Sequence, residues 1–160
     1  MEENKENDKQ VPIKELSKSE KLEKAFAKER VEISEFIKVN ITSKMNDIQN
    51  IANVQVHILS QRQRLVDKAN ELRSANRKQK QLIASARNQK YRFYKLEYDL
   101  KLNDYEIKNH IEADIESTSS MMKMIDNQIL FYKETTETVD KCIWMVKYLI
   151  ESEKYKSGGF

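Results

Sequence analysis

Apolar side chains recur at helical spacing along most of this 160-residue chain. Between Ser19 and Phe93 they follow one another at intervals of mostly three, four or seven residues, which places them on one face of an α-helix. Polar residues such as Gln55 and Asn76 interrupt this stripe, and a polar residue in a helical seam weakens packing or selects one register. The pattern predicts long helices throughout residues 19–102.

Capping residues indicate where these helices begin and end. Ser19 precedes the first apolar residues of the stripe and is the predicted N-cap, and a kink or break is expected near Asn40 or Asn53. Asn103, followed three residues later by Glu106, has the spacing of a capping box and predicts the start of another helix. The predicted divisions are a disordered polar tail at 1–18, the helical region 19–102, a C-terminal helical region at 103–157 and a tail at 158–160.

The C-terminal region has the most regular hydrophobic pattern. Its apolar positions alternate steps of three and four over more than five heptads, as in a coiled-coil seam. β-branched Ile and Val occupy both seam positions, which disfavours a two-stranded coil and favours a higher-order homo-oligomer. A hairpin packed within one chain is the alternative. The predicted oligomerisation residues are Ile111, Ile115, Met122, Ile125, Ile129, Tyr132, Val139, Ile143, Val146 and Ile150.

The composition supports an all-α fold with long helices. The chain has two glycines and one proline, whereas strands need turns rich in Gly, Pro, Asn or Asp. With 39% hydrophobic residues spread along the sequence, the core of a single chain is expected to be thin. Helices of this kind usually bury their apolar stripes against partner helices, so we expect a helical hairpin that assembles with further copies.

The charges are segregated, although the formal net charge is only +3. Residues 1–71 are neutral overall, residues 72–101 carry +7, and residues 102–160 carry −4. From Leu72 to Leu96 the 25 residues include eight Lys and Arg side chains and no carboxylate. Because basic side chains neutralise phosphates, such a segment is expected to bind a polyanion.

Aromatic residues are interleaved with these cations, and most of the cations and tyrosines share one face of a helical wheel. The predicted nucleic-acid contacts are Arg73, Arg77, Lys80, Arg87, Lys90, Tyr91, Arg92, Phe93, Tyr94 and Lys95. Since aromatic faces stack on exposed bases, we expect a preference for single strands and little dependence on base sequence. A solvated basic helix face and a docking site for an acidic protein are the alternatives.

Nothing in the sequence indicates catalysis or a cofactor. His57 and His110 are isolated from any Cys or His at metal-ligand spacing, and a Gly-rich phosphate loop is missing. We therefore expect no enzymatic activity, no metal site and no cofactor. Cys142 is the single cysteine, which fits a reducing compartment, and no apolar run approaches the roughly 18 residues that span a bilayer. The protein is expected to be cytoplasmic and free of membranes.

The order of these features resembles the UvsY recombination mediators of large tailed phages. The resemblance covers roughly residues 45–158, so the residues before about 45 are an extension relative to that family. The family's basic element usually has a Lys-x-Arg-x-x-Tyr-like context, and Phe93 and Tyr94 bring the aromatics one position nearer here. The residues that carry the resemblance are Lys90-Tyr91-Arg92-Phe93-Tyr94, the segment from Tyr98 to Tyr105, Asp114, the stretch 125–132 and the segment from Ile150 to Tyr155.

The resemblance implies a function and a set of partners. Members of that family bind single-stranded DNA weakly, form ring-like homo-oligomers through their C-terminal helices, and help load the phage RecA-like recombinase onto DNA held by the phage single-strand-binding protein. Lys90 and Arg92 would be the first residues to carry over as DNA contacts. The expected function is thus a recombination mediator, located in the cytoplasm of an infected bacterial host if the protein is phage-encoded. A coiled-coil structural or adaptor protein and an RNA-binding accessory protein are the alternatives.

Overall fold

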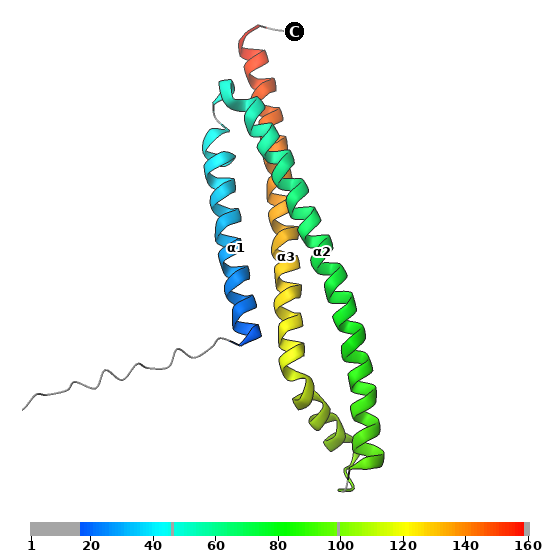
Figure 1. Cartoon of the computed structure of the whole chain (residues 1–160). Coiled ribbons are helices and arrows are strands. Elements are labelled where there is room, and N and C mark those ends of the chain that lie inside the picture. The colour runs from blue at the N-terminus through cyan, green and yellow to red at the C-terminus, as the bar shows by residue number, and fades with distance from the viewer. Residues whose placement is uncertain (1–16, 46, 99, 159–160) are drawn as a thin grey trace, which may run out of the picture.

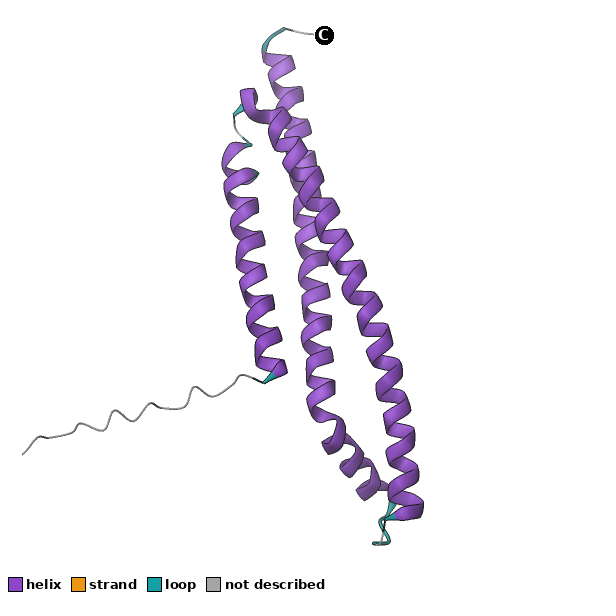
Figure 2. Cartoon of the chain, in the orientation of Figure 1, coloured by secondary structure: helices purple, strands orange, loops and turns teal. Residues whose placement is uncertain are grey.

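The structure is a computed structural model that describes residues 17–45, 47–98 and 100–158. It contains three long helices, α1 (Lys18–Asn40), α2 (Ile51–Arg92) and α3 (Asp104–Lys156) (Figure 1). Two 3₁₀ turns, Thr42–Lys44 and Ile48–Asn50, connect α1 to α2, and a π-helical turn, Phe93–Glu97, follows α2. No strand occurs in the described ranges (Figure 2), and the predicted all-α fold class is confirmed.

α2 and α3 form an antiparallel hairpin, and α1 packs along only part of it (Figure 1). α1 has 23 residues and α3 has 53, which correspond to about 35 and 80 Å at about 1.5 Å per residue. Ser19, near the start of α1, donates a hydrogen bond to the sulfur of Met124, near the middle of α3. From there α1 runs toward the C-terminal end of α3, so α1 does not reach the closed end of the hairpin.

Capping boxes fix the starts of α1 and α3. The side chain of Asn103 accepts from the backbone N–H of Glu106, and the Glu106 carboxylate accepts from the N–H of Asn103, as the sequence predicts. The predicted N-cap of the first helix is wrong by two residues, because Ser17 rather than Ser19 caps α1. Glu20 lies three residues after Ser17 and completes that box.

The boundaries of the predicted segments differ in part from those in the structure. Residues 1–16 and 159–160 lie outside the described residues. Residues 17 and 18 already belong to the capped start of α1, so the predicted boundary at 18/19 moves toward the N-terminus. The helical region 19–102 is divided between Asn40 and Ile51, where the sequence predicts a kink or break.

The hydrophobic core consists of two clusters. The larger one joins all three helices and the connection after α1: Ile33, Ile37, Ile41, Met45, Val54, Ile58, Leu65, Ala69, Tyr132, Val139, Cys142 and Val146. The smaller one joins α2 to α3 toward the closed end: Ile83, Ile107, Ile111 and Ile115. Between the two clusters the seam is polar, since buried Asn76 donates to Asp126 there. The two ends of the hairpin are therefore held by separate apolar contacts.

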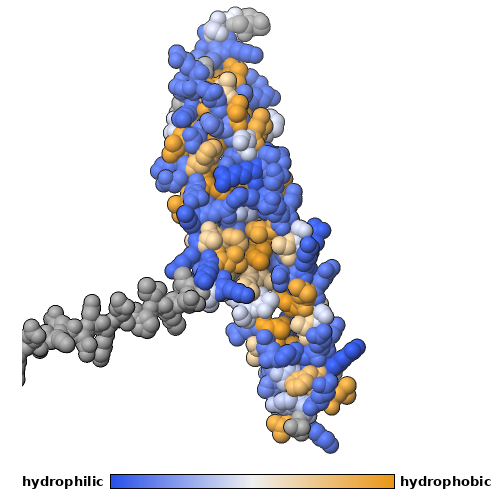
Figure 3. All heavy atoms as spheres, in the orientation of Figure 1, coloured by the Kyte–Doolittle hydropathy of each residue, from blue (hydrophilic) through white to orange (hydrophobic). Residues whose placement is uncertain are grey.

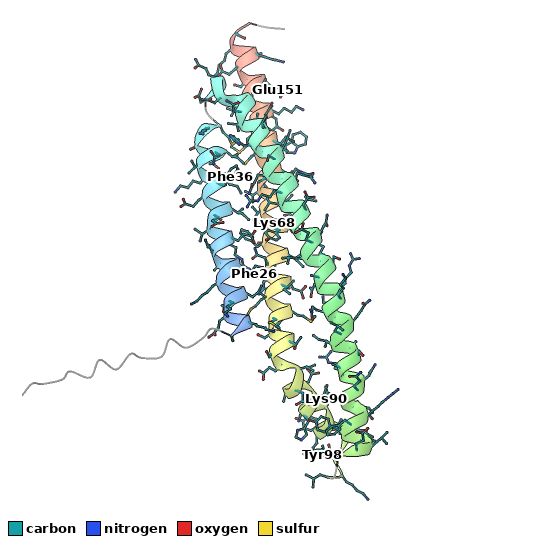
Figure 4. All side chains as sticks on the ribbon, viewed as in Figure 1. Phe26, Phe36, Lys68, Lys90, Tyr98 and Glu151 are labelled. Carbon is teal, nitrogen blue, oxygen red and sulfur yellow. The ribbon has the colours of Figure 1, made fainter. Side chains whose placement is uncertain are left out.

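A polar network lies within the larger cluster and holds α1 on the hairpin. Tyr132 Oη and Gln128 Nε2 both donate to Glu29 Oε2, at 2.5 and 3.3 Å. Lys68, labelled in Figure 4, forms an ion pair with the other oxygen of the same carboxylate. Arg30 Nε donates to Gln128 Oε1 at 2.7 Å. Because Gln128 and Tyr132 are buried, α1 must keep this register or leave polar groups without partners, which is costly.

Candidate nucleic-acid interface

The basic segment occupies the second half of α2 and the π-helical turn that follows it. The residues of this part of α2 are mostly Arg, Lys, Gln, Leu and Ala, which are good helix formers, so the local sequence favours one continuous helix. Nine of the ten predicted nucleic-acid contacts are exposed, and Tyr94 is half-buried. The segment spans about 33 Å between Arg73 and Lys95 at about 1.5 Å per residue.

Four of the predicted cations face carboxylates of α3 across the hairpin. Because the first half of α3 runs antiparallel to the second half of α2, the charge segregation seen in the sequence is met partly within the chain. This pairing is what sequence reasoning missed, and the net charge of −4 after residue 101 was its available signal. The ion pairs are Lys80–Asp126 at 3.6 Å, Arg87–Glu112 at 3.0 Å, Lys90–Asp114 at 2.8 Å and Lys95–Asp104 at 2.7 Å.

Other cations of the segment form no ion pair within the part of the chain that the structure describes. Arg77, Lys78 and Arg92 are exposed and have no carboxylate within ion-pair distance there. Arg73 donates only to the amide oxygen of Asn70, at 3.2 Å. Within the basic segment these four side chains are the most available phosphate ligands, because no carboxylate among the described residues neutralises their charge.

The aromatic residues form a cluster at the closed end of the hairpin. Phe93, Tyr94 and Tyr98 meet edge to face, with ring centroids 5.2–5.9 Å apart. His110 of α3, which the sequence leaves isolated, stacks on Tyr94 at 5.3 Å. Figure 4 shows Lys90 and Tyr98 at this end, and Lys90 Nζ lies 6.0 Å from the centre of the Phe93 ring. The cluster leaves Phe93 and Tyr98 partly exposed, so ring surface remains accessible beside the cations.

Asp114 connects the basic and the aromatic parts of the interface. Its Oδ2 accepts from Lys90 Nζ at 2.8 Å and from Tyr94 Oη at 3.0 Å. These two donors, Lys90 first, hold the pKa of Asp114 below its ordinary value of 3.8. The hydrogen bond to Asp114 raises the pKa of Lys90, while burial and then the same carboxylate raise the pKa of Tyr94. Lys90 and Tyr94 therefore keep their protons at neutral pH.

The predicted oligomerisation residues divide between the core and the surface. Ile111, Ile115, Tyr132, Val139 and Val146 are buried within the chain, and Met122, Ile125, Ile129 and Ile150 are half-buried. Ile143 is exposed. The intrachain hairpin thus uses half of the predicted seam, and the structure buries Gln128 and Cys142 in places where the pattern pointed to their neighbours Ile129 and Ile143.

An apolar surface remains on α2 and α3 beside the larger core cluster. A groove of about 280 Å³ is lined by Gln55, Ile58, Leu59 and Ile143. Trp144, Met145 and Tyr148 continue the exposed apolar surface along α3, each more than half exposed. Figure 3 shows apolar side chains reaching the surface between polar ones on the face in view. This surface, rather than the whole predicted seam, is available to another helix.

Two further findings bear on the chemistry of the chain. No group of three or more His, Cys, Asp or Glu side chains is arranged to hold a metal ion in residues 17–45, 47–98 and 100–158. Within the same ranges no helix is both long and apolar enough to span a membrane.

Comparison of this chain with models of known protein families, with curated proteins and with solved structures finds no match.

Proposed function

We propose that this protein is a non-enzymatic, single-stranded-DNA-binding recombination mediator, which helps a RecA-like recombinase to load onto DNA held by a single-strand-binding protein. The observation that carries the DNA-binding part is the exposed face of α2 on which Arg73, Arg77, Lys78 and Arg92 have no carboxylate partner among the described residues. The mediator part rests on the resemblance of the segments around Lys90 and after Tyr98 to the UvsY family.

The face offers both kinds of contact that a single strand uses. Exposed cations along about 33 Å of helix can follow a phosphate chain. At the end of this stripe Tyr91 and Phe93 are 42% and 39% exposed, and their rings can stack on unpaired bases. Because bases in a duplex are already stacked on each other, the aromatic contribution favours a single strand.

Assembly into a homo-oligomer, ring-like as in the resembling family, would strengthen a weak contact. The groove at Leu59 and Ile143 and the exposed side chain of Trp144 offer apolar area for a second copy. Joining several basic faces makes each further contact to the same strand intramolecular, so avidity exceeds the affinity of one face by orders of magnitude. A strand held at many weak points can be released stepwise to a recombinase.

Fluorescence anisotropy of a labelled single-stranded oligonucleotide, titrated over a range of salt concentrations, tests this proposal. Arg77→Gln/Arg92→Gln is expected to weaken binding and to reduce the slope of log affinity against log salt by about 1.4, at about 0.7 per phosphate contact. Lys123→Gln/Lys141→Gln removes the same charge from exposed positions of α3 and is expected to leave the slope unchanged. Absence of binding by the wild-type protein at low salt would refute the DNA-binding assignment.

A coiled-coil structural or adaptor protein that docks an acidic partner is the second candidate. The observation that favours it is the ability of the same face to bind carboxylates, as the pair between Arg87 and Glu112 illustrates. This candidate predicts oligomers with no affinity for oligonucleotides beyond that of a generic basic helix. Matched DNA and RNA competitors in the same titration separate the mediator from an RNA-binding protein.

A further inference from the structure

Acid–base pairs follow the hairpin from its middle to its closed end. The bases are Lys80, Arg87 and Lys90 on α2 and Lys95 in the π-helical turn, and their partners on α3 are Asp126, Glu112, Asp114 and Asp104. The pairs therefore lie along the basic segment that is expected to contact DNA. Every base in this set is one that the sequence predicts to bind phosphate.

The pairs contribute little to the stability of the fold. All eight side chains are between 32% and 74% exposed, and exposed ion pairs are weak because water and salt screen them. The two helices are held together there by the smaller apolar cluster, which combines Ile83 of α2 with Ile107, Ile111 and Ile115 of α3. The carboxylates can therefore move away from the bases while the hairpin stays closed.

A carboxylate and a phosphate compete for the same donors. Both accept charge-assisted hydrogen bonds from Lys and Arg, and Glu112 does so through two oxygens, at 3.0 and 3.1 Å from Arg87 Nη2. Asp114 accepts from Lys90 and also from Tyr94, so it holds the cation and the nearby ring together. A phosphate that binds Lys90 must share it with Asp114 or displace that carboxylate.

We propose that the α3 carboxylates Glu112 and Asp114 act as an autoinhibitory mimic of phosphate, which occupies Arg87 and Lys90 until a nucleic-acid strand displaces it. This inference concerns the regulation of the DNA-binding face and rests on the proposed function. The device keeps the affinity of one face low and makes the bound strand easy to release. Such a property suits a protein that must pass its strand on to another.

The mimic changes how binding depends on salt. When a phosphate replaces a carboxylate on Lys90, the freed carboxylate stays beside the strand and its charge offsets that of the cation, so this contact adds little to the salt dependence. Salt dependence is then set mainly by the cations that have no carboxylate partner in the described part of the chain, namely Arg73, Arg77, Lys78 and Arg92. Four such contacts to a single strand give a slope of about 3 per chain, at about 0.7 each.

Glu112→Gln/Asp114→Asn tests the inference in the full-length protein by anisotropy on the same oligonucleotide. Loss of two weak competitors is expected to tighten binding about two- to thirtyfold and to steepen the salt slope by about 1.4. The matched control is Glu116→Gln/Glu134→Gln, which removes two exposed carboxylates of α3 that form no ion pair among the described residues. Asp114→Glu keeps the charge and is expected to bind as wild type.

The outcomes separate this inference from the proposed function. Equal effects of the test pair and the control pair would show a general charge effect and overturn the mimic. Unchanged binding by Glu112→Gln/Asp114→Asn, with weaker binding by Arg77→Gln/Arg92→Gln, would overturn the mimic and leave the DNA-binding function standing. Failure of the wild type and of every variant to bind at low salt would overturn both. Unchanged helical circular dichroism confirms that each variant is folded.

Discussion

Tyr132→Phe is predicted to weaken the attachment of α1 to the hairpin. The substitution removes the hydroxyl that donates to Glu29 Oε2 and leaves the shape of the buried ring unchanged, so no cavity forms. Hydrogen bonds to charged groups contribute about 1.5–3 kcal/mol, and Glu29 keeps Lys68 and Gln128 as partners. The expected loss in the free energy of unfolding is therefore at the lower end, about 1.5 kcal/mol.

Urea unfolding followed by circular dichroism at the helical band measures this loss. With a denaturant slope of about 2 kcal/mol per molar, a loss of about 1.5 kcal/mol lowers the urea midpoint by about 0.8 M. Tyr148→Phe is the matched control, because Tyr148 is 64% exposed and surface substitutions change stability by about 0.5 kcal/mol or less. Since the stability of an oligomer depends on its concentration, wild type and variants are compared at one protein concentration and again at a tenfold lower one.

A specific result would refute this reasoning. If Tyr132→Phe unfolds at the same midpoint as Tyr148→Phe, the hydroxyl of Tyr132 does not hold α1 in place. A double-mutant cycle with Glu29→Gln adds a second check, because contacting residues couple by about 0.5–3 kcal/mol while independent ones add. Additive losses would show that the two side chains do not act on each other.

The remaining predictions concern the assembly surface and the closed end of the hairpin. Ile143→Asp places a charge in the exposed groove and is expected to lower both the mass of the oligomer found by sedimentation and its apparent affinity for DNA. The control Ser120→Asp, at an exposed position of α3, is expected to change neither quantity. An unchanged mass of the Ile143→Asp variant would show that Ile143 does not lie in the subunit interface. The pKa of Asp114 is expected below 3.8 in a carboxyl NMR titration, and Lys90→Met is expected to raise it, because the first of its two donors is lost. If Lys90→Met leaves the pKa of Asp114 unchanged, the ion pair between Lys90 and Asp114 does not form in solution.

The helices themselves are predictable from the sequence, because their determinants are local. Few glycines and prolines, a regular apolar stripe and the pair of Asn103 with Glu106 each act within about one turn of helix. The predicted start of the first helix was wrong for an equally local reason. Ser17 and Glu20 form a capping box before the apolar stripe begins, whereas the choice of Ser19 relied on the start of the stripe alone.

The seam of α3 was harder to predict, because it depends on residues far away in the sequence. A straight helix has 3.6 residues per turn and drifts by about 20° per heptad from a strict coiled-coil repeat, so the buried face moves to neighbouring positions. Gln128 is buried in place of an aliphatic residue because Glu29 and Arg30, nearly 100 positions earlier, satisfy its amide. No periodicity in α3 alone contains that information.

Folding partly neutralises the positive charge of the basic segment, which the sequence alone assigns to a polyanion partner. An excess of +7 in residues 72–101 indicates a polyanion partner only when no acidic element lies against it, and here carboxylates of α3 between Asp104 and Asp126 pair with bases of that segment. The two segments together retain +3 per chain. A single chain with this small net positive charge is expected to bind a strand weakly. An assembly multiplies the net positive charge and keeps each single contact easy to break. In the proposed mechanism the carboxylates of α3 limit the affinity of each face for a strand, and assembly through the apolar groove at Ile143 restores that affinity for the whole oligomer.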